Sequence, residues 1–297
     1  MRVGTVALIG RPNVGKSSLI NALLKTKTSI VSPKPQTTRN SIRCIYNDED
    51  SQIIFTDTPG IFELSNESNN LNIFLNESVI NSLDDSDVIC WLIDSGVRKL
   101  KNDDIETAKL LSESKRPVIL VANKTDLANP DEAVKLFCEI CEFKAKIAIS
   151  AKNNKNLDEF LKLIKNFLEE GELLYDTEIL MDSTERFMAS EIIREKMLML
   201  LRDEVPHCSA VEINDYKSPD EYENRKNLYI RASLITETEG QKAILIGANG
   251  SMIKKIGSLS RNELEKITGY KVFLDLWVKV IPKWRKNNFA LKRLGYA

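Results

Sequence analysis

The sequence predicts two domains. The first is an α/β domain whose mixed, mostly parallel sheet carries helices on both faces, and the second is a smaller α+β domain. Short apolar runs alternating with helical patterns indicate the first, and the order helix-strand-strand-helix-helix-strand indicates the second. The length of 297 residues also favours two domains. We expect the first domain at 1–172, a linker at 173–183, the second domain at 184–282 and a basic tail at 283–297.

Charge is distributed unevenly along the chain. The formal net charge is −1, yet residues 240–297 hold 12 Lys and Arg against 3 Asp and Glu. A basic segment on a nearly neutral protein favours an anionic macromolecule as partner, either nucleic acid or a membrane surface. No apolar run is long enough to span a membrane and the first strand begins at the N-terminus, so we expect a cytoplasmic protein. The five cysteines show no disulfide framework, and we expect Cys138 and Cys141 to be buried thiols in a helix.

The most informative stretch follows a predicted strand, Thr5–Ile9, and precedes a predicted helix, Ser18–Leu24. It fits the phosphate-loop pattern G-x-x-x-x-G-K-[ST] in the required context. Its glycines let the backbone approach a polyphosphate, and the N–H groups at the helix start face the negative charge. The lysine can reach the β- and γ-phosphates, and the next serine hydroxyl can ligate Mg²⁺. The expected contacts to the nucleotide are Gly10, Arg11, Pro12, Asn13, Val14, Gly15, Lys16, Ser17 and Ser18.

A second motif closes a predicted hairpin. Residues 31–39 contain two prolines and three hydroxyl side chains, which predicts a loop before the strands Asn40–Tyr46 and Gln52–Thr56. The motif that ends the second strand is Asp57, Thr58, Pro59 and Gly60. A carboxylate at the carboxyl end of a strand beside a phosphate loop is the expected partner of Mg²⁺, and Gly60 can offer its N–H to a γ-phosphate.

Two further motifs indicate which base is bound. The polar stretch Glu63–Asn72 predicts a loop, Ile73–Leu83 a helix, and Val88–Ile93 and Val118–Ala122 strands. An N-K-x-D motif follows the last strand, and its Asp can accept two hydrogen bonds from guanine, a donor pair that adenine lacks. After the strand Ile147–Ile149, the backbone of an S-A-K motif can meet the guanine carbonyl. The two motifs are Asn123, Lys124, Thr125 and Asp126, and Ser150, Ala151 and Lys152.

The motifs G-R-P-N-V-G-K-S, P-Q-T-T-R, D-T-P-G, N-K-T-D and S-A-K resemble, in order and spacing, those of translation-factor-like small GTPases of the Era and Der branch. The resemblance implies that GTP or GDP binds with Mg²⁺, which Ser17, Asp57 and a switch threonine hold. That threonine is Thr38, with Thr37 as the alternative. The resemblance assigns catalysis to Lys16, Thr38, Gly60 and Asn13.

The residue after the D-x-x-G glycine affects the expected rate. Ras-like enzymes use a glutamine there to orient the attacking water, whereas this chain has Ile61, which cannot form that hydrogen bond. Slow intrinsic hydrolysis is therefore expected. Asn13 occupies the place of an asparagine in related GTPases that use K⁺, so we hypothesise that K⁺ supplies positive charge during hydrolysis.

The remaining chain predicts the second domain. We expect helices at Leu157–Glu169 and Glu185–Asp203, then the strands Ala210–Tyr216 and Asn227–Ile235 around a charged loop at 217–226. We also expect a helix that is capped by Thr238 and ends at Ile246, a helix at Ser260–Thr268 and a strand at Lys271–Ile281.

A G-x-x-G motif between the two later helices, in this order of elements, resembles a KH domain of the type with N-terminal extra elements. KH loops of this form clamp about four single-stranded nucleotides. The resemblance implies RNA contacts from Gly247, Ala248, Asn249, Gly250, Lys254, Lys255, Lys283 and Arg285. Ile244, Ile246, Ile253 and Ile256 either line the base groove or belong to the core. Trp284 either stacks on a base or packs inward.

A GTPase domain followed by a KH domain resembles the Era family. That family implies a monomeric GTP-dependent switch that binds single-stranded small-subunit ribosomal RNA near its 3′ end and assists assembly of the small ribosomal subunit. Two alternatives stay open. The basic C-terminal segment could hold the protein on the cytoplasmic face of the inner membrane, or the GTPase could serve RNA modification.

Overall fold

The computed structural model describes residues 1–32, 34, 36–61, 69–221 and 226–296. They form two compact units, of which the second contains Asn69–Leu71 and the chain from Ser183 onward. Parts of three predicted loops lie outside the described residues: two prolines of 31–39, most of Glu63–Asn72, and 222–225 of the charged loop.

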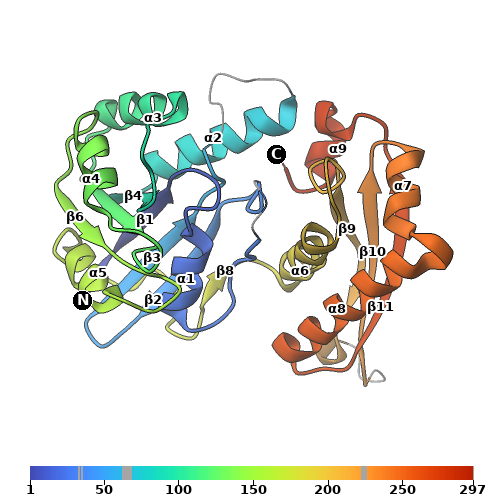
Figure 1. Ribbon diagram of the computed structural model, residues 1–297. Helices are drawn as coiled ribbons and strands as arrows, with labels where there is room; N and C mark the ends of the chain where they lie inside the picture. Colours follow the sequence, from blue (N-terminus) through green and yellow to red (C-terminus); the bar gives the residue numbers. More distant parts are fainter. Residues whose placement is uncertain (33, 35, 62–68, 222–225, 297) are drawn as a thin grey trace. The chain divides into compact units, whose positions relative to one another are not determined.

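The first unit is built on an eight-stranded sheet in the order β6-β5-β4-β1-β3-β2-β8, with β7 also paired to β1 (Figure 1). Its strands are β1 Arg2–Ile9, β2 Ile42–Asn47, β3 Ser51–Asp57, β4 Val88–Asp94, β5 Val118–Asn123, β6 Ala145–Ala148, β7 Glu169–Glu170 and β8 Met181–Asp182. The central pairs are parallel, whereas β2, β7 and β8 pair antiparallel. The predicted mixed, mostly parallel sheet is therefore confirmed.

Helices cover both faces of this sheet because its central strands are apolar throughout. The helices are α1 Lys16–Leu24, α2 Asn70–Asp84, α3 Asn102–Glu113, α4 Asp131–Cys138 and α5 Leu157–Lys165. Val79, Leu111 and Phe137 bring α2, α3 and α4 against one face around Trp91. On α5, Phe160 stacks on Phe55 of β3.

The parallel strands all end at the same edge of the sheet, where ligands of such folds collect. The phosphate loop follows β1 there. Asp57, Asp94 and Asn123 are the last residues of β3, β4 and β5. This topology gathers motifs from distant parts of the sequence into one region.

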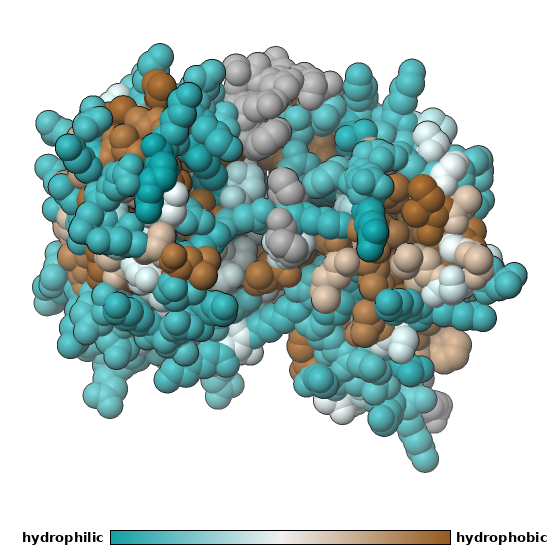
Figure 2. All heavy atoms as spheres, viewed as in Figure 1, coloured by the Kyte–Doolittle hydropathy of each residue, from teal (hydrophilic) through white to brown (hydrophobic). Residues whose placement is uncertain are grey.

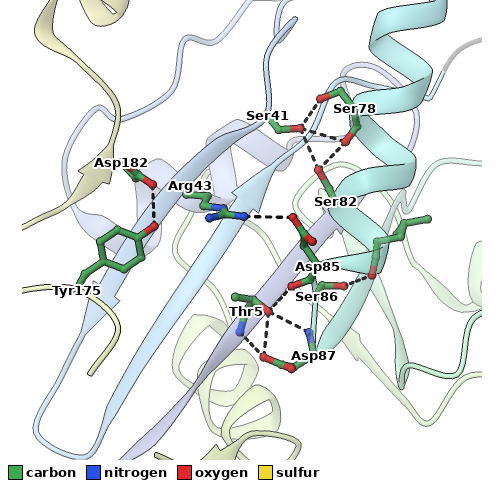
Figure 3. A network of polar contacts seen from close by, with 11 residues as sticks. Thr5, Ser41, Arg43, Ser78, Ser82, Asp85, Ser86, Asp87, Tyr175 and Asp182 are labelled. Carbon is green, nitrogen blue, oxygen red and sulfur yellow. Dashed lines mark hydrogen bonds and ion pairs between the residues drawn. The ribbon is translucent and has the colours of Figure 1, made fainter. Parts of the chain in front are cut away.

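A network of polar side chains fastens α2 to the strands beside it (Figure 3). The Ser41 hydroxyl, just before β2, lies 2.7 Å from the Ser78 hydroxyl and 3.0 Å from the Ser82 hydroxyl of α2. At the far end of α2, Arg43 of β2 pairs with Asp85. The backbone N–H of Thr5 donates to Asp87 at 2.8 Å.

Several predicted elements of the first unit differ from the structure. The helix α5 ends at Lys165, and Glu169–Glu170 instead pair with β1 as a short strand. The predicted linker contains β8, which pairs with β2. Cys138 and Cys141 are half-buried rather than buried, and Cys141 lies beyond α4. The described part of the chain has no group of three or more His, Cys, Asp or Glu suited to a metal.

The second unit is a three-stranded sheet in the order β11-β10-β9, with β10 and β11 parallel. Its elements are α6 Glu185–Leu200, β9 Ala210–Lys217, β10 Leu228–Thr236, α7 Glu239–Ile246, α8 Ser251–Thr268, β11 Val272–Val280 and α9 Asn288–Arg293. Residues Ile193, Leu245 and Ile256 bring α6, α7 and α8 onto one face of this sheet. The Thr238 hydroxyl caps α7, as predicted.

Two helices of the second unit differ from their predicted bounds. The helix α8 is continuous from Ser251, because Gly257 continues the helix instead of breaking it. A Cβ at Gly257 would lie 3.4 Å from the Leu276 side chain, so this position is where α8 packs on β11. The helix α6 ends at Leu200, three residues before its predicted end.

Candidate functional site

The phosphate loop borders a cavity of about 360 Å³. The residues around it come from the loop, from the segment before β2, from Gly60 and from the N-K-T-D motif. They are Pro12, Asn13, Gly15, Lys16, Ser17, Ser18, Ile30, Val31, Ser32, Lys34, Gln36, Thr37, Thr38, Gly60 and Lys124. One cavity therefore brings together four of the five predicted motifs.

The loop needs glycine at both ends. Gly10 has a φ of +142°, and a Cβ there would lie 2.3 Å from the Leu92 carbonyl oxygen. Gly15 has a φ of +101°, and its Cβ would lie 2.3 Å from the Asn123 amide nitrogen. Both close approaches exclude side chains, so the loop can lie this close to β4 and β5 only with glycine at these two positions.

Lys16, the first residue of α1, is buried where the loop meets the helix. Its ammonium donates to the carbonyls of Gly10 at 3.0 Å and Arg11 at 3.2 Å. Burial lowers the pKa of Lys16 to about 8, and the nearby charge of Asp57 offsets part of that shift. A cation held in so little water interacts strongly with an anion placed beside it.

Two hydroxyl side chains meet where Mg²⁺ is expected, and the carboxylate of Asp57 lies near enough to Lys16 to affect its pKa. The Thr38 and Ser17 hydroxyls lie 3.1 Å apart, and Asp57 is fully buried at the end of β3. Hydroxyl and carboxylate oxygens are the donors that Mg²⁺ prefers, so this set fits the ion. Thr37 instead donates to the Lys34 carbonyl at 2.6 Å. The geometry thus favours Thr38 over Thr37.

Ile61 points away from the cavity. Its N–H donates to the Gly10 carbonyl at 3.1 Å, and its side chain, 1% exposed, packs in the core with Val79 and Trp91. The preceding glycine is as constrained, since a Cβ at Gly60 would lie 2.7 Å from the backbone nitrogen of Pro12. Ile61 therefore anchors the D-T-P-G segment to the sheet.

The two motifs predicted to contact the base are joined by Asn123. Its side chain donates to the Val14 carbonyl at 2.8 Å and accepts from the Ala151 N–H at 3.0 Å, linking three loops. The Ser150 hydroxyl donates to Asp126 at 2.5 Å, and this bond lowers the pKa of the Asp126 carboxyl. The carboxylate therefore stays ionised and able to accept hydrogen bonds from a base.

The other motif residues have structural partners. Thr58 donates to the Leu8 carbonyl at 2.7 Å, and Thr125 donates to the Ile149 carbonyl at 3.0 Å. Lys152 is exposed. The Lys124 ammonium pairs with Asp94 at 2.9 Å, which holds its aliphatic stem beside the loop. The contacts of Thr125 and Lys124 order the N-K-T-D motif.

Sequence reasoning missed three residues that support this site. Asp94 pairs with Lys124, and Ser95 donates to the Asn123 carbonyl at 2.7 Å. Both come directly after the predicted apolar strand Val88–Ile93, and this placement at a strand end is the sequence signal that could have identified them. Asp104 binds the Arg11 guanidinium, so this side chain, expected at the nucleotide, points to α3 instead. No motif marks Asp104.

The G-x-x-G motif forms a tight turn between α7 and α8. Gly247, Asn249 and Gly250 have φ values of +71°, +51° and +76°. A Cβ at Gly247 would lie 2.8 Å from Met252, whereas Gly250 meets no atom closer than 3.8 Å. Gly247 is therefore required by packing as well as by backbone conformation, and Lys254 and Lys255 stand exposed on the first turn of α8.

A groove of about 370 Å³ lies beside this turn, between α8 and β11. It is lined by Ile253, Lys254, Gly257, Ser258, Arg261, Val272, Phe273, Leu274 and Leu276. Sequence reasoning named only Ile253 and Lys254 among these. Figure 2 shows hydrophobic atoms gathered over α7 on a largely hydrophilic surface, where Ile244 is half-exposed. Ile256 is fully buried and belongs to the core.

The tail residues divide into buried and exposed groups. Trp284 packs inward, donating to the Cys208 carbonyl at 2.9 Å and stacking on Tyr296, so it cannot receive a base. Arg285 binds Glu237 through two hydrogen bonds, at 3.2 and 2.7 Å. Of the two predicted RNA contacts in the tail, Lys283 is exposed and Arg285 is held in this ion pair.

Two family models match the chain. Residues 5–124 match the family described as 50S ribosome-binding GTPase, and residues 204–285 match the KH domain family. The two matches cover the phosphate-loop region and the G-x-x-G region described above.

Whole-chain relatives share both regions. The GTPase Era of Thermoanaerobacter sp. (strain X514) is 44% identical over 299 residues, covering all of this chain and 97% of that protein. The GTPase Era of Thermotoga maritima is 44% identical over 298 residues, covering 98% of this chain and 96% of that protein.

Two solved structures match over the full length of this chain, each with a TM-score of 0.93 and 41% identity. One is Era in complex with MgGDPNP and nucleotides 1506–1542 of 16S ribosomal RNA, of which 99% is covered. The other is an Aquifex aeolicus Era variant bound to GDP·AlF₄⁻, of which 100% is covered.

Proposed function

This chain is a GTPase of the Era family, with a GTPase domain and a KH domain, and we propose that it is a GTP-controlled switch on small-subunit ribosomal RNA. It would bind the single-stranded region near the 3′ end and assist assembly of the small ribosomal subunit. The observation that carries this proposal is that a single chain contains both the phosphate-loop cavity and the groove beside the G-x-x-G turn, with Lys254 and Lys255 at the start of α8. A solved relative contains 16S ribosomal RNA.

Residue roles follow from the geometry of the cavity. Lys16 would lie against the β- and γ-phosphates, with the loop N–H groups at the start of α1. Ser17, Thr38 and Asp57 would hold Mg²⁺, which when bound neutralises phosphate charge. Asp126 would accept hydrogen bonds from guanine, and Asn123 would keep the base-reading loop in register with the phosphate loop.

Hydrolysis would be slow in the isolated protein, because Ile61 is buried and cannot orient water. Asn13 lines the cavity beside Lys16 and Gly60, and its amide oxygen is a suitable ligand for K⁺. We therefore expect faster hydrolysis in K⁺ than in Na⁺, and loss of that difference in Asn13→Ala. Equal rates of the intact chain in both salts would contradict a role for K⁺.

The switch would act through the segments that touch the γ-phosphate. Bound GTP would order the segments around Thr38 and Gly60, and this order would change the affinity of the KH domain for RNA. RNA affinity measured by filter binding in GDP and in a GTP analogue tests the coupling. Equal affinities in the two states would contradict it.

A membrane role is the second candidate, carried by the exposed lysines of the tail and of α8. The described residues contain no helix long and apolar enough to cross a bilayer, so contact would be peripheral, on the cytoplasmic face of the inner membrane. Filter binding to RNA and flotation with anionic liposomes, each repeated with Lys254→Glu/Lys255→Glu, separate the two candidates. We expect the Lys254→Glu/Lys255→Glu variant to lose RNA binding. We also expect the protein to elute as a monomer in gel filtration. Loss of liposome binding alone would favour the membrane.

A further inference from the structure

The KH sheet has a second face, opposite the one on which α6, α7 and α8 pack. Phe273 and Trp277 of β11 project from it and are 62% and 63% exposed, which is unusual for such large apolar side chains. Their neighbours in strand register on β10 are Tyr229 and Ser233. Near the other end of this face, Arg293 of α9 binds Glu212 of β9. The aromatic part remains open.

The aromatic rings are arranged as a stacking platform. Tyr229 and Phe273 stack with ring centroids 5.8 Å apart and planes inclined by 15°. Trp277 lies four residues further along β11, which corresponds to about 13 Å in an extended strand. An exposed indole offers a flat surface on which any nucleic-acid base can stack.

The charges around these rings favour an anion. The Lys217 ammonium lies 6.0 Å from the centroid of the Tyr229 ring. Lys279 follows Trp277 by two residues in β11, so it lies on the same face, and it is exposed. Among the described residues neither lysine forms an ion pair with a carboxylate. The acidic groups of the face, Asp215 and Asp275, are both bound by Arg231, at 3.4 and 3.1 Å.

This face is continuous with the G-x-x-G groove, because Phe273 borders both. A strand of RNA leaving the groove past Phe273 would next meet Trp277. We propose that the face formed by Tyr229, Phe273 and Trp277, flanked by Lys217 and Lys279, extends the RNA site and stacks an unpaired base on Trp277. This inference rests on the proposed RNA-binding function and adds a second recognition surface to it.

The tryptophans provide a direct measurement. The chain has three, and Trp91 and Trp284 are 1% and 0% exposed, so quenching by a bound base reports mainly on Trp277. The full chain is titrated with synthetic RNAs cut from the 16S rRNA segment that corresponds to nucleotides 1506–1542. We expect RNAs of about 4 nucleotides to fill the groove without quenching, and RNAs of about 12 nucleotides to quench.

Substitutions separate stacking from fluorescence. Trp277→Ser should weaken binding of the longer RNA roughly 5- to 100-fold and leave the shorter RNA unaffected, whereas Trp277→Phe should retain most of the affinity. Met199→Ala, which removes another exposed apolar side chain of the same unit, should change neither affinity. Because Trp277 is exposed, these variants should fold normally.

The outcomes distinguish this inference from the proposed function. One outcome is that Lys254→Glu/Lys255→Glu abolishes RNA binding while Trp277→Ser binds long RNA as tightly as the unsubstituted chain. RNA binding at the groove would then be supported, and base stacking on Trp277 would be refuted. If neither variant alters RNA binding, the proposed function fails as well. If Trp277→Ser instead dissolves a dimer seen by sedimentation, with RNA affinity unchanged, the face is a self-association surface and the platform is also refuted.

Discussion

The guanidinium group of Arg11, in the phosphate loop, donates to the carboxylate of Asp104, near the start of α3, through two hydrogen bonds. Asp104 is 2% exposed, and it also accepts the Lys101 N–H at 2.8 Å. The loop that holds Lys16 is therefore fixed from outside the nucleotide cavity, through a bidentate contact to a neighbouring helix.

Asp104→Asn should destabilise the protein by about 2–4 kcal/mol and weaken GTP binding, because it leaves a partly buried guanidinium without its charge partner. Urea unfolding and nucleotide titration measure the two effects. The matched control is Glu132→Gln, which breaks the exposed pair of Arg98 with Glu132 and should cost under about 0.5 kcal/mol. Equal costs for both variants would show that the Arg11 contact is unimportant.

Thr38→Ala should raise the Mg²⁺ concentration needed for GTP-analogue binding at least about tenfold, since it removes one of two neighbouring hydroxyls. Thr37→Ala should have a much smaller effect, because Thr37 bonds the Lys34 carbonyl instead. Titration of Mg²⁺ with a fluorescent GTP analogue measures both variants. The reverse order of effects would assign the ion to Thr37.

Asp126→Asn should lower GTP affinity by roughly 100-fold or more and raise affinity for XTP, because an amide can donate to the xanthine carbonyl where a carboxylate would repel it. Competition binding with the two nucleotides measures the change. Asp131→Asn, at an exposed carboxylate at the start of α4, should leave the preference unaltered. A variant that still prefers GTP would move base recognition away from Asp126.

Lys16→Met should stabilise the nucleotide-free protein at pH 7, by up to about 3 kcal/mol, because burial lowers the pKa of Lys16 from 10.5 to about 8. The unfolded chain binds more protons than the folded one between these values, so the stability of the unsubstituted protein rises with pH there. The advantage of the variant should therefore shrink from pH 8 to pH 10.5. Denaturation without nucleotide measures it, and a pH-independent difference would contradict the burial of a charged lysine.

Ile61→Gln should not accelerate GTP hydrolysis, although it installs the residue type that Ras-like enzymes use. Its amide would enter the core and should cost about 1–3 kcal/mol of stability. Ile105→Gln, at an exposed position of α3, should cost under about 0.5 kcal/mol. A stable, faster Ile61→Gln enzyme would show that this position faces the nucleotide during turnover.

The motifs could be predicted from sequence because each has a fixed local pattern next to a strand end. Gly10, Gly15 and Gly247 belong to those patterns, and the structure supplies the reason for them, because a Cβ at each would meet neighbouring atoms. The choice between Thr37 and Thr38 needed coordinates, since adjacent residues in a loop have no periodic signal to separate them. Asp104 was not predictable, because its partner lies 93 residues away.

The second unit shows the same limit for aromatic residues. Sequence left open whether Trp284 stacks on a base or packs inward, and it gave Trp277 no role, because alternation in a strand does not say which face is covered. The structure buries Trp284 against Cys208 and Tyr296 and exposes Trp277. The predicted start of a helix at Ser260 was wrong, because Gly257 lies inside α8, which begins at Ser251.

The serine cluster of Ser41, Ser78 and Ser82 has a kinetic consequence. It joins the strand that follows Thr38 to the helix that follows Gly60, through contacts of 2.7 and 3.0 Å. We therefore expect a movement of either segment after phosphate release to strain its contacts with the other. The segments on the two sides of the nucleotide should therefore move together. A stopped-flow record of their relaxation after phosphate release should contain a single phase.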